Sequence, residues 1–418
     1  MSDFIHPDVL IDILTRLPIK TLMQCACVCK SWYSLLTNPS FITAHLDRST
    51  VPDNKSDDDL LLVRSYSEDR NEEQYSVYFD NETFDEYAKL EFPLKSSRKC
   101  YFRIVGSCNG LMCLSDDQFG YAETLFLWNP SIRKTLALPS VRVGFKSHGP
   151  FMHAIGFGFD PLTNDYKVVR IVYLDCVEIP PEVDIFTLRT GTWRNISHLG
   201  LPYLIQERAP QACLNGATHW IASDLEMMRG VSNLIVSFNM SDEVFGEILL
   251  PDSMAHDTWL RLRGVRIAKF QESLSLIGPK VSSGEDSCCI WMMKEYGIAD
   301  SWTKLFCIDV RGHGDFKRLV GFRNNGELLW ATSRGYLVSY DPEAKQFKDL
   351  GIHGSTNSGY EESFYADAYT QSLVLLGVKL CDSVTCEGSP VLHGEESGSK
   401  KSKEKGEKQG SGWSGKSK

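Results

Sequence analysis

Three cysteines stand at alternate positions within residues 17–36, LPIKTLMQCACVCKSWYSLL, and cysteine thiolates serve both as metal ligands and as redox groups. Zinc sites typically contain paired ligands, such as two C-x2-C motifs or one C-x2-C motif with H-x3-H, and neither pattern occurs in this sequence. On a helix Cys25, Cys27 and Cys29 would turn by about 200° at each step, so they could not converge on one ion. The spacing favours small buried apolar residues over a metal or redox site.

Other chemical motifs are equally weak. Residues 410–417, GSGWSGKS, satisfy the phosphate-loop pattern, but no strand precedes them and the sequence stops at Lys418. His219 and Trp220 follow an Asn-Gly turn and are interpreted as a packed strand pair. No G-x-S-x-G or H-E-x-x-H motif occurs. We therefore predict no catalytic, cofactor or metal site and no enzyme.

Composition narrows the class of partner. The formal net charge of -10 argues against nucleic-acid binding, which needs a basic face to neutralise phosphates. No apolar run approaches the roughly 18 residues of a membrane span. The N-terminus lacks the features of a signal peptide, so the thirteen cysteines are expected to be free thiols in a reducing compartment. We expect a location in the cytoplasm, the nucleus or both.

Residues 4–45 read as a small helical module. Pro7 and Asp8 suit the start of a helix, and apolar residues then recur on one face as far as Leu17, before Pro18 ends it. A second stripe begins at Leu22. Helices this short cannot bury a complete core alone, so their apolar surface is expected to meet a partner. Residues 46–59 are polar and are interpreted as a linker.

Beyond residue 59 the sequence becomes a repeat of short strands. Asn-Gly, a hairpin signal, occurs at Asn109, Asn215 and Asn325, spaced by 106 and 110 residues. A second kind of unit lies between these copies, with Trp193 and Trp302 109 residues apart. Each unit is thus about 54 residues with about four strands, close to the size of a β-propeller blade.

The blade count follows from the unassigned ends of this region. Five units are visible, and "YADAYTQSLVLLG" from Tyr365 together with the strands from Asp59 could form a sixth. A ring closed by strands from both chain ends has no open edge. The fold class is therefore mainly β with a small all-α N-terminal module, as a β-propeller of about six blades over residues 60–378. Residues 379–418 are too polar to fold and are predicted to be a disordered tail.

The helical module resembles an F-box. The resemblance covers "IHPDVLIDILTRLPIKTLMQCACVCKSWYSLLTNPSFITAHL", and "NPSIRKTLALP", "DYKVVRIVY" and "IWMMKEYGIADSWTKLF" look like the F-box-associated, kelch-like region of plant F-box proteins. That family includes S-locus and immune-regulator F-box proteins. Two departures are His6, where the family usually has Leu, and the absence of the Gly-Gly dipeptide of strict kelch repeats.

The resemblance implies a role. In this family the F-box docks onto the Skp-type adaptor of an SCF ubiquitin ligase, and through it a cullin, while the propeller captures a target protein. The F-box residues that it assigns to the adaptor contact are Pro7, Leu10, Ile13, Leu14, Leu17, Pro18, Leu22, Val28, Cys29, Lys30 and Trp32. Two alternatives stay open. One is a ligase-independent F-box scaffold. The other is a propeller enzyme or glycan-binding protein, which clustered acids or a metal at the central opening would indicate.

Overall fold

The computed structural model describes eleven stretches of the chain, and every structural statement below concerns these residues. They are 6–50, 59–67, 70–94, 101–117, 124–174, 179–224, 233–250, 265–279, 287–309, 316–355 and 363–378. The predicted tail, 379–418, and most of the predicted linker lie outside them. None of the described helices is long and apolar enough to cross a membrane.

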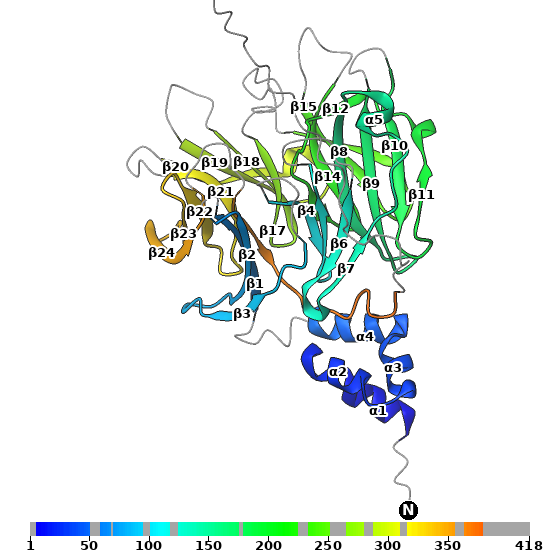
Figure 1. Ribbon diagram of the computed structural model, residues 1–418. Helices are drawn as coiled ribbons and strands as arrows, with labels where there is room; N and C mark the ends of the chain where they lie inside the picture. Colours follow the sequence, from blue (N-terminus) through cyan, green and yellow to red (C-terminus); the bar gives the residue numbers. More distant parts are fainter. Residues whose placement is uncertain are drawn as a thin grey trace, which may run out of the picture. The chain divides into compact units, whose positions relative to one another are not determined.

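Four helices form the N-terminal module (Figure 1): α1 (Pro7–Leu14), α2 (Ile19–Ala26), α3 (Lys30–Leu36) and α4 (Pro39–Thr50). Pro18 precedes α2 as its N-cap, so the proline lies at the break between two helices, where its missing N–H costs nothing. Helix α4 continues to Thr50, past residue 45, where the sequence analysis ended the helical module.

The remaining strands form six antiparallel sheets, which are the six blades of a β-propeller (Figure 1). From the innermost strand outward, the first three blades are β25 (Tyr365–Ala368), β1 (Leu60–Ser67), β2 (Glu72–Phe79) and β3 (Glu86–Leu90); β4 (Arg103–Cys108), β5 (Leu111–Ser115), β6 (Leu125–Asn129) and β7 (Lys134–Ala137); and β8 (Met152–Asp160), β9 (Asp165–Tyr173), β10 (Glu182–Thr187) and β11 (Thr192–Asn195).

The fourth blade has an inner strand broken in two. Both β12 (Tyr203–Ile205) and β13 (Ala212–Leu214) pair with β14 (Ala217–Asp224), followed by β15 (Asn233–Asn239) and β16 (Phe245–Leu249). The last two blades are β17 (Arg266–Phe270), β18 (Ser273–Pro279), β19 (Ser287–Met293) and β20 (Trp302–Asp309); and β21 (Phe316–Phe322), β22 (Leu328–Thr332), β23 (Tyr336–Asp341) and β24 (Gln346–His353).

The predicted closure of the ring is confirmed. Strand β25 pairs antiparallel with β1, with Arg64 opposite Tyr365 and Leu61 opposite Ala368, so one blade is built from both ends of the region. The prediction of six blades is therefore correct. Closure removes the open edge that a linear array of sheets would leave.

A repeated turn explains why the sequence echoes itself. Asn129, Asn239 and Asp341 each accept hydrogen bonds at Oδ1 from backbone N–H groups two or three residues on. The residue four positions later has a positive φ in each copy, at Arg133 (53°), Glu243 (57°) and Lys345 (54°). The side-chain oxygen stands in for a backbone acceptor, which makes Asn or Asp the residue that this turn needs.

The Asn-Gly signals give two different turns. At Asn109–Gly110 and Asn215–Gly216 both residues have positive φ, as a two-residue hairpin of type I′ requires. At the third copy Gly326 has φ 89°, and the loop is closed by a hydrogen bond from the Arg323 N–H to the Glu327 carbonyl.

The cores lie between neighbouring blades, where strands in the middle of a blade are buried on both faces. All nine residues of β9 and all five of β5 and β6 are buried. Trp128, Trp302 and Trp330 are buried core residues. Trp193 and Trp291 are only partly buried, at the margins of two clusters.

One expectation from the sequence is wrong in detail. Cys289 and Cys307 face each other across β19 and β20, with Cα atoms 4.2 Å apart, and form a disulfide, so not every cysteine is free. Only the start of the segment from Tyr365 forms a strand. Strand β25 ends at Ala368, and residues 374–377 form a turn.

Candidate functional sites: the helical surface and the propeller channel

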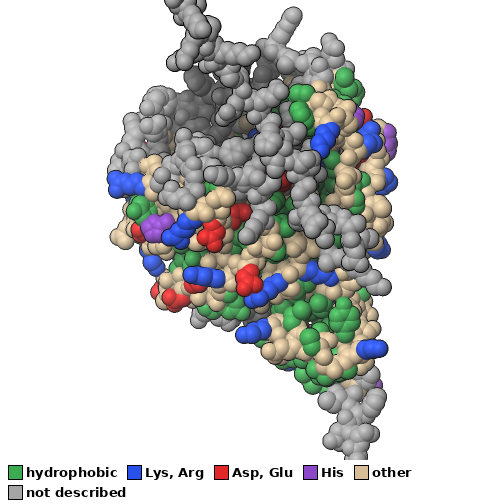
Figure 2. All heavy atoms as spheres, in the orientation of Figure 1, with side chains coloured by type: hydrophobic (Ala, Val, Ile, Leu, Met, Phe, Trp, Pro, Cys, Tyr) green, Lys and Arg blue, Asp and Glu red, His purple; other side chains and the backbone are tan. Residues whose placement is uncertain are grey.

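The helical module has an apolar interior and an apolar exterior. Leu14, Ile19, Leu22 and Leu36 are buried in its core together with Phe41. On the outside, four large apolar side chains are exposed: Val9, Ile13, Val28 and Tyr33. Figure 2 shows hydrophobic side chains gathered over this part of the molecule. A patch of this kind on so small a module is typical of a protein-binding surface.

The eleven residues that the resemblance assigns to the adaptor contact divide by burial. Pro7 begins α1. The exposed ones are Ile13, Pro18, Val28, Cys29 and Lys30, the partly buried ones Leu10, Leu17 and Trp32, and the buried ones Leu14 and Leu22. Leu14 and Leu22 therefore support the surface from within, and the exposed apolar residues of this set are Ile13, Pro18 and Val28.

Two histidines fix the ends of the helices. His6, which departs from the family pattern, is the N-cap of α1, and its Nδ1 accepts the Asp8 N–H at 3.4 Å. His45 is buried in α4 with its Nε2 3.1 Å from the Leu17 carbonyl oxygen, and burial lowers its pKa. A neutral imidazole can donate to this carbonyl at the α1–α2 break, where the helix leaves C=O groups without intrahelical partners.

The three alternating cysteines do not form a common site. Cys25 packs against the core of the module, and the Cys27 thiol donates to the Met23 carbonyl at 3.4 Å. Cys29 is the N-cap of α3, with Sγ 3.0 Å from Ser31 Oγ, and this hydrogen bond lowers the pKa of the Cys29 thiol. Among the described residues no group of three or more His, Cys, Asp or Glu could hold a metal ion.

The helical module rests on the C-terminal segment of the propeller region. Leu373 and Leu376 are members of the same buried cluster as the helices, whereas Val374 and Leu375 between them pack into the core beside the second blade. The Asn164 side chain donates to Thr43 Oγ1 at 2.8 Å, a second contact between the propeller and α4. The sequence analysis placed a polar linker between the two parts, and their cores nevertheless meet at residues 373–376.

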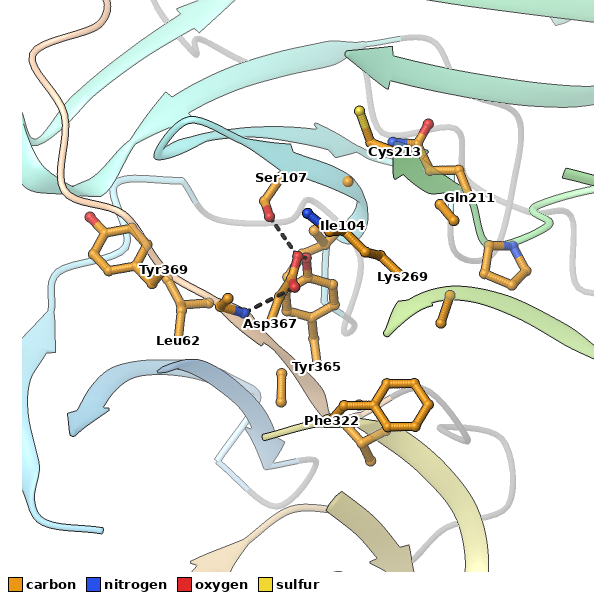
Figure 3. A pocket seen from close by; sticks show the side chains of 18 of the residues that line it. Leu62, Ile104, Ser107, Gln211, Cys213, Lys269, Phe322, Tyr365, Asp367 and Tyr369 are labelled. Atoms are coloured by element: carbon orange, nitrogen blue, oxygen red, sulfur yellow. Dashed lines mark hydrogen bonds between the residues drawn. The ribbon is translucent and has the colours of Figure 1, made fainter. Parts of the chain in front are cut away.

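The second candidate site is the central channel of the propeller, a cavity of about 840 Å³ lined by the inner strands. Halfway along it Asp367 accepts hydrogen bonds from Ser107 Oγ at 2.6 Å and from the Tyr365 hydroxyl at 2.9 Å (Figure 3). In the same view Lys269 extends toward Asp367. Enclosure within the channel raises the pKa of the Asp367 carboxyl, and the Lys269 charge partly opposes that rise.

Glycines and Gln211 allow the inner strands to approach closely at this depth. Gln211 accepts the Phe157 N–H at 2.7 Å and donates to the Phe157 carbonyl at 2.8 Å, which ties the third and fourth blades together. Its side chain lies where a Cβ on Gly106 would be, so any larger residue at that position would displace it. The break between β12 and β13 places both Gln211 and Arg208 in the channel lining.

Buried charges lie at the interface of the second and third blades. Arg103 donates to both carboxylate oxygens of Asp117, through Nε at 2.8 Å and Nη2 at 2.5 Å, and His153 Nε2 is 2.8 Å from the same carboxylate. Burial opposes ionisation of Asp117, but the Arg103 charge and these hydrogen bonds outweigh it, and the pKa of Asp117 lies well below its usual range. Removing one of these three side chains would leave a charge buried without a partner, which is strongly destabilising.

Sequence reasoning found the helical site and missed the channel. The described channel residues come from five of the six blades, and each of these blades contributes only a few positions, mostly in or beside its inner strand. The available signal was an Arg at or near the start of the inner strand, as in Arg103, Arg266 and Arg318. No short motif carries it, because the residues meet only after the ring closes.

Comparison with known domain families gives two matches. Residues 5–43 match the F-box domain, and residues 54–373 match the F-box associated beta propeller domain. Together they cover α1–α3, the first part of α4 and all six blades.

Curated relatives are F-box proteins of Arabidopsis thaliana. F-box protein At3g07870 is 30% identical over 390 residues, covering 84% of this chain and 88% of its own. F-box protein CPR1 is 29% identical, covering 88% of each chain, and F-box/kelch-repeat protein At3g23880 is 26% identical, covering 79% and 85%. Among solved structures, a putative 6-phosphogluconolactonase from Bacteroides uniformis aligns over 72% of this chain and 98% of its own, at 12% identity and a TM-score of 0.39.

Proposed function

The chain belongs to the F-box proteins that carry an F-box-associated β-propeller, and we propose that it is the substrate receptor of an SCF-type ubiquitin ligase. Membership makes it an F-box substrate-recognition protein with an Skp-type adaptor as its partner. The finer proposal is that the helices link it through this adaptor to a cullin, while the propeller holds a target protein for ubiquitination. In this role the chain is non-catalytic and works in the cytoplasm or nucleus.

One observation supports the proposal most directly. Ile13 and Val28 are exposed by 45% and 67%, although apolar side chains gain free energy when they are covered. They lie in α1 and just before α3, within the segment that matches the F-box domain. In the proposed role, the chain holds the target close to the ligase, and the resulting high effective concentration favours ubiquitin transfer to the target.

The first test is co-purification with an Skp-type adaptor. The variant Ile13→Glu/Val28→Glu places two charges on the proposed contact, and we expect adaptor binding to fall by about a hundredfold or more because a charge buried without a partner is costly. Leu249→Glu is the matched control, since Leu249 is an exposed apolar residue on β16 of the propeller. The proposal fails if the double variant and the control recover the adaptor equally well.

The second test separates a ligase receptor from a ligase-independent scaffold. Full-length Ile13→Glu/Val28→Glu should still hold its target, because both residues lie outside the propeller. Expressed in excess beside the intact chain, it should compete for the target and lengthen its half-life. The full-length variant is preferable to a truncation, since removing the helices would expose Leu373 and Leu376. Bound proteins whose half-lives do not change would favour the scaffold.

A further inference from the structure

The two ends of the propeller channel can be told apart from the direction of the inner strands. Arg318 Nη2 donates to the Phe364 carbonyl at 2.8 Å, just before β25 begins. Farther along the same pair of strands, Gly321 lies against the carbonyl of Ala366. Strands β21 and β25 therefore run in the same direction, as the inner strands of a propeller do, and residues at strand starts share one end of the channel.

Five arginines gather at the end where the inner strands begin. Arg103 and Arg266 are the first residues of β4 and β17, and Arg318 lies near the start of β21. Arg64 lies opposite Tyr365, the first residue of β25, and the Arg208 N–H donates to the carbonyl of His153 near the start of β8. All five line the cavity, and we call this end the basic mouth.

The opposite end of the channel carries acidic as well as basic side chains and faces the helices. Arg323 donates through Nε to Asp80 at 2.7 Å and through Nη1 to Glu327 at 2.6 Å, and Asn324 donates to Asp59 at 3.0 Å. The helical module contacts the propeller at this end, because Thr43 bonds to Asn164, which follows the last residue of β8. The basic mouth is therefore at the end of the channel away from the proposed adaptor surface.

Cationic side chains outnumber acidic ones in the described part of the channel lining. Among the described residues that line the cavity, seven are Arg or Lys and three are Asp or Glu, although the whole sequence carries a formal charge of -10. Of these three acids, Asp59 and Glu272 lie at the far end and Asp367 lies at mid-depth. A surplus of cationic side chains facing a cavity attracts anionic groups to it.

Contacts behind the arginines hold them in place. Arg103 is fixed by Asp117, Arg318 by the Phe364 carbonyl, and Arg64 lies over the Tyr101 ring at 4.2 Å. Guanidinium groups held in this way lose little further freedom when they bind, and their planar donors match carboxylate and phosphate oxygens in pairs.

From this arrangement we propose that the basic mouth binds an anionic segment of the target protein, through its carboxylate or phosphate groups. The inference rests on the proposed function, since the ligand is part of the captured target. The cavity is large enough for a few side chains, within the range of sites that enclose a ligand. Arg266 and Arg318 are the principal recognition residues, because both are partly exposed in the lining, whereas Arg64 and Arg103 are buried.

The test is fluorescence anisotropy with the full-length protein bound to its adaptor. The probes are three labelled short peptides with the same Ser/Gly frame, one containing Glu, one phosphoserine and one Gln. The Glu or phosphoserine peptide should bind in a salt-dependent way, and the Gln peptide should bind about tenfold more weakly or not at all. If only the phosphoserine peptide binds, the mouth recognises phosphate groups. If both anionic peptides bind, a carboxylate group is enough for recognition.

Variants locate the binding to the mouth. Arg266→Gln/Arg318→Gln should weaken binding of the anionic peptide by about tenfold or more. Lys317→Gln is the matched control, because Lys317 is exposed, adjacent to Arg318 in β21 and absent from the channel lining. Arg208→Gln, at a residue outside any strand, provides a second variant if the double variant unfolds, and it too should weaken binding.

The outcomes separate this inference from the function on which it rests. Equal affinity for anionic and Gln peptides, or unchanged affinity in the Arg266/Arg318 and Arg208 variants, overturns the inference whatever the adaptor result. If anionic peptides bind through the basic mouth but Ile13→Glu/Val28→Glu does not weaken adaptor binding, the inference about the mouth is supported and the proposed receptor function is rejected.

Discussion

The helical module keeps apolar side chains on its surface, whereas the propeller keeps charged side chains in its interior. Val28 is 67% exposed, but the side chains of Arg103 and Asp117 are 5% and 0% exposed. An exposed apolar group is stabilised when another chain covers it, while a buried charge must be matched within its own fold. The difference indicates that the module is completed by a partner and that the propeller completes itself.

The two regions meet at residues 373–376. Leu373 and Leu376 belong to the core of the helices, and Val374 and Leu375 belong to a core of the propeller. The segment that follows the closing strand β25 therefore also seats the helices. Ring closure and helix docking are coupled through one short stretch of chain.

The largest effect is expected from breaking the buried charges of the propeller. Asp117→Ala leaves the Arg103 charge buried without its partner, and we expect it to destabilise the propeller by about 3 to 5 kcal/mol. Denaturant unfolding followed by intrinsic fluorescence measures the change. Glu91→Ala is the control, because Glu91 pairs with Arg133 on the surface and should have no measurable effect. Equal stability of the two variants would mean that the Arg103–Asp117 pair does not hold the blades together.

A smaller effect is expected at the seat of the helices. Leu373→Ala opens a cavity in a cluster where Leu373 is 1% exposed, at a cost of about 2 to 5 kcal/mol. Hydrogen exchange should become faster at the amides of α1–α4 and stay unchanged at β9. Leu162→Ala, at a residue 78% exposed, is the control. Faster exchange spread evenly over both regions would contradict the assignment of Leu373 to the helical core.

The smallest effect is a pH dependence of the propeller. Burial raises the pKa of Glu73 to about 7, although Arg64, 3.8 Å away, opposes the rise. A raised folded-state pKa means that the folded chain holds this proton more tightly than the unfolded chain. The contribution of Glu73 to the free energy of unfolding is therefore fully present below the unfolded-state pKa, and it is lost as the pH rises through the folded-state pKa of about 7.

We therefore expect Glu73 to reduce the free energy of unfolding by about 2 to 3 kcal/mol between pH 5 and pH 8. Glu73→Gln removes the titration and should remove this part of the pH dependence. Unfolding in denaturant at the two pH values, for both proteins, measures it. An undiminished decline in the variant would assign the pH dependence to other groups.

Local sequence signals predicted the helices, the blade count and the closure of the ring. The helix break at Pro18 and the turns at Asn109–Gly110 and Asn129 are local features, because one residue fixes a dihedral angle or supplies an acceptor. These signals recur along the chain, so the period of the repeat is visible in the sequence. The resemblance to F-box proteins adds the proposed docking residues for the same reason, since their motif is contiguous.

Tertiary structure alone decided which of those residues are accessible and what faces the channel. Ile13 and Leu14 are neighbours in one helix, yet one is 45% exposed and the other 1%. The Cys289–Cys307 pair depends on the register of β19 and β20, which the sequence does not mark. Arg103, Arg266 and Arg318 lie in three different blades and share one mouth only because the ring closes. Long-range juxtaposition of this kind is set by how the blades pack, and no local pattern encodes it.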